Sequence, residues 1–252
     1  MTKNISRTLI IGLGGTGQRV ICDIKKRLLR TYGEIPSLVK FLAFDTDDLY
    51  RENIPFKYYH EGYTFEDFKY CIQNNEFYKT PRHWYRPDVI NEDPVCSEKI
   101  DLEELEKVMA RLNDRGSAGY RVAGRASFLN DSGNIIDVLN RTINTLRGAC
   151  LTANEQARGY NVSNAEISVY VIASLAGGTG SSAIMDMSRM LQIAGINVQY
   201  NANPNMDKIF GMFFLPKFFE AKPNTSNIRV NAFTALSELD YTMGLADVMK
   251  YP

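Results

Sequence analysis

The sequence has few of the residues that build metal sites and disulfide frameworks. Its 252 residues include four cysteines and two histidines, and no two cysteines are spaced as CxxC. This excludes a zinc module and a disulfide-stapled scaffold. No apolar run approaches the roughly 18 residues of a membrane span, and the polar start, Met1–Arg7, is unlike a secretory signal. We therefore expect reduced thiols, no membrane span and a cytoplasmic location.

The sequence also has no excess of charge of either sign. Its 29 Lys and Arg residues balance 29 Asp and Glu residues, so no general basic field exists to attract nucleic acid. Hydrophobic residues make up 44% of the chain and charged residues 23%, which is typical of a globular protein. We expect an ordinary folded protein that does not bind nucleic acid.

Apolar strands alternate with amphipathic helices along most of the chain. This alternation predicts an α/β fold, Rossmann-like and doubly wound, with a mainly parallel sheet and helices on both faces. Strands are expected over residues 8–11, 38–44, 166–173 and 209–215. Helices are expected over residues 18–32, 65–74, 101–113, 133–151, about 177–194 and 228–243, with loops over 116–125 and 152–164. We predict a single nucleotide-binding domain over 1–252, with an aromatic-rich insertion at about 50–98 that forms a small satellite core.

A glycine loop follows the first expected strand. The run Gly12-Leu13-Gly14-Gly15-Thr16-Gly17, followed by Gln18, matches GxGxxG, in which glycine permits a tight turn and close approach of a phosphate to backbone amides. Asp45 ends the next strand, but it lies about 28 residues beyond Gly17 rather than about 20. Taken alone, this pattern fits either an NAD(P)-binding domain or a purely structural turn, so it is weak evidence for function.

A second glycine loop, Ala176-Gly177-Gly178-Thr179-Gly180-Ser181, follows a later strand. A dinucleotide-binding domain needs no second phosphate-gripping turn, whereas the tail of a nucleoside triphosphate can lie between two such loops. No lysine follows the glycines in the pattern of a P-loop. We expect backbone amides, helix dipoles and Mg²⁺ to offset the phosphate charge instead.

Several segments, in the same order, resemble the tubulin/FtsZ family. The second glycine loop resembles the family signature GGGTG[ST]G, and the first loop resembles the family's first nucleotide loop. Asp45-Thr46-Asp47 resembles the Asn-Thr-Asp of bacterial members, and Leu215–Glu220 resembles RPFxFEG. Gly124-Arg125 is similar to a feature of the large bacterial tubulin-like proteins.

The resemblance implies a GTP- or GDP-binding domain, with Mg²⁺ accompanying the triphosphate. Glu220 is expected at the ribose, and Arg229 and Asn231 on a helix that touches guanine. Asp45 and Asp47 are candidates for the ribose or a water-mediated ion, or for capping the turn. The predicted nucleotide-binding residues are Gly12, Leu13, Gly14, Gly15, Thr16, Gly17, Gln18, Asp45, Asp47, Gly116, Gly119, Arg121, Ala176, Gly177, Gly178, Thr179, Gly180, Ser181, Glu220, Arg229 and Asn231.

The resemblance also implies head-to-tail self-association, as in a cytoskeletal GTPase. In that family, the carboxylate loop that hydrolyses GTP and a second domain follow the region matched here. We therefore predict no catalytic residue before Pro252 and expect binding rather than turnover from these residues alone. Two alternatives stay open at this point: an NAD(P)-dependent oxidoreductase domain that uses the first loop alone, and a non-catalytic scaffold with a vestigial pocket.

Overall fold

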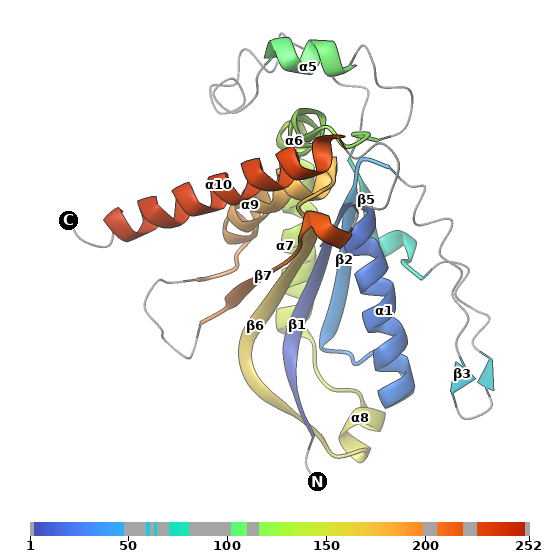
Figure 1. The fold of residues 1–252 in the computed structure, drawn as a ribbon. Helices are drawn as coiled ribbons and strands as arrows, with labels where there is room; N and C mark the ends of the chain where they lie inside the picture. The colour runs from blue at the N-terminus through green and yellow to red at the C-terminus, as the bar shows by residue number, and fades with distance from the viewer. Residues whose placement is uncertain are drawn as a thin grey trace.

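A five-stranded parallel sheet forms the centre of the molecule (Figure 1). The structure, a computed structural model, describes residues 3–47, 59–60, 63–64, 71–80, 102–109, 116–198, 206–218 and 226–249. The strand order is β5-β2-β1-β6-β7, and every neighbouring pair is parallel. The strands are β1 (Lys3–Leu13), β2 (Val39–Asp45), β5 (Phe77–Lys79), β6 (Tyr160–Ser174) and β7 (Lys208–Phe214). The predicted α/β class is confirmed.

Helices connect the strands, as the alternation predicted. They are α1 (Gly14–Tyr32), α5 (Leu102–Met109), α6 (Arg121–Asn130), α7 (Ser132–Gly148), α8 (Ala153–Ala157), α9 (Gly178–Ile193) and α10 (Ser226–Met249). Short 3-10 turns lie at η1 (Asn74–Glu76) and η2 (Pro216–Phe218), and β3 (Tyr59–His60) pairs with β4 (Tyr63–Thr64) in a separate antiparallel ladder. None of the helices in these described ranges is long and apolar enough to cross a membrane.

Side-chain alternation along the strands divides the core into two layers. Leu9 and Ile11 of β1 are fully buried in a cluster that includes residues of α7 and α9. Ile10, between them, belongs to a second cluster with Ile21 of α1. Successive strand residues point to opposite faces, so α1 covers one face of the sheet and α7 and α9 cover the other. The doubly wound arrangement is therefore confirmed.

Two helical crossover connections lie on opposite faces of the sheet. The position in the sheet where the connections change face is the topological switch point. β1 connects to β2 through α1, and β6 connects to β7 through α9. The change of face falls between β1 and β6, which are neighbours in the sheet. Ligands in open α/β sheets bind at the carboxyl ends of the strands at such a point.

Helix α6 and the region before β6 differ from the prediction. α6 covers the second half of the segment 116–125, which was expected to be a loop, and its Gly124 packs directly on the second glycine loop: a Cβ at Gly124 would lie 2.8 Å from the carbonyl oxygen of Gly178. Residues 152–164 were also expected to be a loop. They form α8, in which Thr152 and Glu155 cap each other's backbone N–H groups, and the first third of β6, which is exposed apart from the buried Tyr160. The spacing of apolar residues along the chain cannot reveal α6, α8 or the start of β6. These elements are stabilised by contacts with residues distant in sequence or by capping hydrogen bonds.

The aromatic-rich stretch contributes to the main sheet, which the sequence did not predict. β5 pairs with the end of β2, and Cys71 and Ile72 are buried in the layer that α1 covers. A three-residue strand is too short to show a period of two in sequence. Most of the helix expected over 65–74, and the ends of the helix expected over 101–113, lie outside the described residues.

Candidate functional site

A cleft of about 320 Å³ opens at the carboxyl ends of β1, β2 and β6, which is within the size range of small-ligand sites. Four segments line it: the turn after β1, the residues after β2, a loop before α6, and the turn between β6 and α9. The lining residues are Leu13, Gly14, Gly15, Thr16, Asp45, Thr46, Asp47, Gly116, Ser117, Ala118, Gly119, Ser174, Ala176, Gly177, Gly178, Thr179, Gly180 and Ile228.

The two glycine loops touch each other at the base of the cleft. Gly14 has φ +69°, a left-handed conformation that glycine adopts without strain. A Cβ at Gly14 would lie 3.3 Å from the backbone nitrogen of Gly180. The two loops, which are more than 160 residues apart in sequence, therefore form one continuous backbone surface.

Both loops lead directly into helix N-termini. α1 begins at Gly14 and α9 begins at Gly178, and the first N–H groups of a helix have no intrahelical partner. The first residues of both helices line the cleft, where their amides and dipoles favour an anion. Among the described lining residues there is no lysine or arginine, so positive potential at the cleft comes from the backbone.

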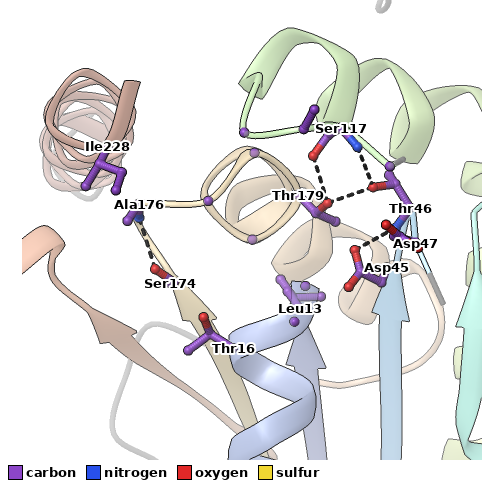
Figure 2. A pocket seen from close by; sticks show the side chains of 18 residues that line it. Leu13, Thr16, Asp45, Thr46, Asp47, Ser117, Ser174, Ala176, Thr179 and Ile228 are labelled. Carbon is purple, nitrogen blue, oxygen red and sulfur yellow. Dashed lines mark hydrogen bonds between the residues drawn. The ribbon is translucent and has the colours of Figure 1, made fainter. Parts of the chain in front are cut away.

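Three hydroxyl groups join the loops at the centre of the cleft, as Figure 2 shows. Thr179 Oγ1 lies 2.9 Å from Thr46 Oγ1 and 3.1 Å from Ser117 Oγ. The backbone N–H of Ser117 donates to Thr46 Oγ1 at 3.0 Å. Thr179 was predicted as a site residue, whereas Thr46 and Ser117 were not. In the sequence, Thr46 follows Asp45, and Ser117 lies between Gly116 and Gly119. These neighbours were the available signals that the two residues belong to the site.

The loop before α6 forms the third wall of the cleft. Gly116, Ala118 and Gly119 all have positive φ, of 56°, 46° and 86°, which explains the two glycines. A Cβ at Gly116 would lie 2.9 Å from Asp47 Cβ, so this loop packs against the acidic segment after β2. Gly116, Gly119 and Asp47, which the sequence proposed as nucleotide-binding residues, line the cleft, and so does Ala118, which it did not name.

Asp45 lies beneath the cleft in a buried hydrogen-bonding environment. It is 4% exposed, and it accepts hydrogen bonds from Gln18 Nε2 at 2.6 Å and from the backbone N–H of Thr46 at 2.8 Å. Burial raises the pKa of its carboxyl to about 7, although hydrogen bonds oppose that shift. Near neutral pH, Asp45 is therefore partly uncharged, which reduces its repulsion of an anion.

Gly12, Gly17 and Gln18, which the sequence proposed as nucleotide-binding residues, do not line the cleft. A Cβ at Gly12 would lie 2.6 Å from the carbonyl carbon of Gly17, and the reverse contact is as short. These two glycines allow α1 to pack closely on β1. Gln18 is fully buried and donates to Asp45, so it acts on the cleft only through that carboxyl.

Arg121 and Asn231 brace the walls of the cleft instead of lining it. Arg121 donates to the carbonyl oxygens of Ser181 and Asn231 at 2.7 and 3.2 Å, and it forms an ion pair with Glu238 at 2.6 Å. These contacts tie α6 to α9 and α10. The side-chain amide of Asn231 donates to the carbonyl oxygens of Gly119 and Ala176, at 2.8 and 3.0 Å. It therefore holds the third and second loops together.

Some of the remaining predicted residues line the cleft and others do not. Ser181 is fully buried and its hydroxyl donates to the carbonyl oxygen of Gly177, so it is absent from the lining. Arg229 is exposed on α10, outside the lining, and Glu220 lies outside the described residues. Leu13, Gly15 and Thr16, also proposed from the sequence, line the cleft. Ser174 and Ile228 were missed, and Ile228 closes the side of the cleft formed by α10 (Figure 2).

Comparison with known proteins gives one family and several structures. A family model described as "Tubulin like" matches residues 9–251. A comparison with curated proteins gave no significant match. The structure is similar to CetZ from Methanosaeta thermophila strain DSM 6194, with a TM-score of 0.50, 16% identity, and coverage of 96% of this chain and 43% of that one.

Two further structures match with lower scores. One is CetZ1 from Haloferax volcanii, a GDP-bound monomer, with a TM-score of 0.49, 13% identity, and coverage of 92% of this chain and 47% of that one. The other is TubZ of Bacillus thuringiensis serovar israelensis in a GTPγS-form protofilament, with a TM-score of 0.43, 15% identity, and coverage of 94% and 42%. The chain therefore spans less than half the length of each of these three solved structures.

Proposed function

Because this chain belongs to the tubulin-like family, we propose that it binds a guanine nucleotide, GTP or GDP. The phosphate tail would lie in the cleft, against the turn that follows β1 and the turn that precedes α9. The observation that carries the proposal is the contact between these two glycine loops, where a Cβ at Gly14 would lie 3.3 Å from Gly180 N. This contact joins two helix N-termini into one anion-binding surface.

The surroundings of the loops suit a phosphate chain. Backbone amides supply donors from both loops, and the hydroxyls of Thr46, Ser117 and Thr179 add groups that can donate or accept. Two carboxyls line the cleft, Asp45 and Asp47, and burial keeps that of Asp45 partly neutral near pH 7. A polyanion is therefore bound by dipoles rather than by lysine or arginine side chains.

Both alternatives are disfavoured by the same geometry. An NAD(P)-binding domain uses the first loop alone, and nothing in that chemistry explains a second glycine loop in contact with the first. A scaffold with a vestigial pocket does not need four positive-φ residues and three linked hydroxyls to line an open cleft.

Magnesium would arrive with the triphosphate rather than occupy a resident site. Within the described ranges no group of three histidine, cysteine, aspartate or glutamate side chains could hold a metal ion. Magnesium at nucleotide sites keeps several waters and binds phosphate oxygens. We assign no protein ligand to it.

Self-association is the second part of the proposal. Membership in the tubulin-like family suggests that copies of the full protein assemble head to tail, and a head-to-tail contact that does not close on itself gives an open polymer. The site derived above supports nucleotide binding, and hydrolysis is not assigned to any residue of the chain.

Gly177 offers a sharp test of nucleotide binding. It lines the cleft, its φ of −84° suits any residue, and a Cβ there would meet no atom within 4 Å. Gly177→Asp therefore places a carboxylate in the proposed phosphate site without strain. Gly133→Asp is the matched control, because Gly133 is exposed in α7 and its Cβ would also meet nothing.

Equilibrium titration with GTP, GDP, ATP and NADH distinguishes the hypotheses. We expect GTP and GDP to bind more tightly than ATP, and NADH not to bind. Gly177→Asp should weaken GTP binding by about tenfold or more, since a like charge at contact distance costs more than about 1.4 kcal/mol. Gly133→Asp should bind as the wild type does. Unchanged GTP affinity in Gly177→Asp, or tight NADH binding, would contradict the proposal.

A further inference from the structure

A second groove, with a volume of about 470 Å³, lies along the outer edge of β2. β5 covers only the last part of that edge, because its pairing with β2 runs from Ala43 to Asp45. Within the described ranges no strand pairs with residues 39–42 on the side away from β1. The groove shares no described lining residue with the nucleotide cleft, so the two sites are separate.

The backbone of Phe41 faces this groove. Backbone groups of successive strand residues point alternately to the two neighbouring strands. The carbonyl oxygen of Leu38 points to β1, where it accepts from Thr8 N, and that of Asp45 points the other way, where it accepts from Thr80 N. Phe41 lies four residues before Asp45, so its N–H and C=O point away from β1 as well. No described strand pairs with them, and a further strand can.

The two sides of the groove differ in charge. Lys40 shares a strand face with Leu42, which packs in the layer that α7 covers, so Lys40 and Arg141 of α7 lie on the same side. Within the described residues neither forms an ion pair, and Arg141 Nε donates to a carbonyl oxygen of its own helix. On the other side, Lys25 of α1 is paired with Glu76. The α7 side therefore has two cations without a carboxylate partner.

We propose that this groove binds an extended acidic segment of a partner protein, which adds to the sheet as a strand beside β2. The N–H and C=O of Phe41 form main-chain hydrogen bonds with that segment. Side chains of a strand alternate in direction, so every second residue of the partner faces Lys40 and Arg141. Carboxylates at these positions complement the two cations.

The positions between the carboxylates should be apolar. They face the side of the groove formed with α1, where Ile35 and the Phe41 ring belong to one hydrophobic cluster. Lys25 Nζ lies 5.1 Å from the centre of that ring, and its charge is already neutralised by Glu76. The preferred partner sequence therefore alternates acidic and apolar residues.

The ends of the groove limit the length of the bound segment. Pro36 and Ser37 line one end, before β2, and Asn75 and Glu76 line the other, before β5. The edge between them offers about four residues, at about 3.3 Å of rise for each. A contact of this length buries little surface, so we expect weak and reversible binding.

Fluorescence anisotropy measures the binding directly. The probe is a fluorescein-labelled peptide of about seven residues that alternates glutamate and valine, and the full chain is titrated into it. We expect saturable binding that weakens as salt is raised. Lys40→Glu combined with Arg141→Glu should weaken it by about tenfold or more, because two attractive charge contacts become repulsive. The matched control, Lys208→Glu with Arg189→Glu, changes an exposed strand lysine and an exposed helix arginine outside the groove and should bind as the wild type does.

Backbone modification of the peptide distinguishes strand addition from charge attraction alone, and it needs only the wild-type chain. Two further peptides of the same sequence are N-methylated at alternate residues, one at the odd and one at the even positions. Every second N–H of an added strand faces β2, so at least one of the two should bind about tenfold more weakly. Full affinity for both would overturn the proposal, as would equal binding by the groove variant and its control. Absence of saturable binding would also overturn it and would leave Lys40 as a charge that keeps an exposed edge from pairing.

Discussion

Gln18 and Asp45 meet beneath the cleft, where Gln18 Nε2 donates a 2.6 Å hydrogen bond to Asp45 Oδ2. Neither side chain is more than 4% exposed. The other amide atom, Gln18 Oε1, is buried and has no hydrogen-bond partner in the described part of the chain. An unsatisfied buried acceptor beside a carboxyl with a raised pKa marks this pair as a costly feature at the base of the site.

Asp45 should make the stability of the nucleotide-free protein depend on pH. Its pKa is about 7 in the folded protein and about 3.9 in an unfolded chain, so folding takes up a proton. The resulting stabilisation is complete below about pH 4 and is lost as the pH rises through about 7, by at most about 4 kcal/mol. Urea unfolding between pH 4 and 8 measures it.

Asp45→Asn provides the control for that measurement, because an amide carries no proton to release. The decrease in unfolding free energy between pH 4 and pH 8 should be smaller in the variant than in the wild type. Parallel pH profiles for the two proteins would show that Asp45 titrates at its ordinary pKa in the folded state.

Thr179→Val should loosen the three walls of the cleft. The substitution keeps the shape of the side chain but removes the hydroxyl that contacts both Thr46 and Ser117. We expect a loss of about 1–3 kcal/mol in unfolding free energy and weaker GTP binding by isothermal titration. Thr179→Ser, which keeps the hydroxyl, should retain most of both. If Thr179→Val and Thr179→Ser lost stability and GTP affinity equally, the effect would come from packing rather than from the hydroxyl.

Gly12→Ala should destabilise the protein without adding any group to the cleft. The new methyl carbon would lie 2.6 Å from backbone atoms of Gly17, so α1 must move away from β1, at a cost of about 1–3 kcal/mol or more. Gly133→Ala introduces the same methyl group where nothing lies within 4 Å and should be neutral or slightly stabilising. Thermal unfolding compares the two, and equal melting temperatures would contradict the close packing.

Glu155→Gln should destabilise the protein at neutral pH and leave it little changed in acid. Burial would raise the pKa of Glu155, but hydrogen bonds from Ser37 and Thr152 lower it overall, with three donor distances of 2.7 Å. The contribution is therefore present above about pH 4.3 and lost as the pH falls through the lowered pKa. We expect a loss of about 1–3 kcal/mol at pH 7 and a smaller loss at pH 3, measured by urea unfolding.

The sequence pointed to much of the lining of the cleft because the glycine loops are local features. A strand, a glycine turn and a helix start are adjacent in the chain, so their pattern is visible without tertiary contacts. Many of the predicted residues that line the cleft, such as Gly14, Gly178 and Thr179, belong to such turns. Arg121 and Asn231 lie outside the lining, and a predicted helix or loop does not reveal which way a side chain points.

The sequence alone therefore determined the α/β class, the order of the main elements and the two phosphate-type turns, since each depends on residues within a few positions of one another. Tertiary structure decided the rest. It brought Thr46 and Thr179 to within 2.9 Å of each other across 133 residues, turned Arg121 toward Glu238, and paired a three-residue β5 with the sheet. Contacts between distant segments are set by how whole helices and strands pack, and no short pattern in the chain records that packing.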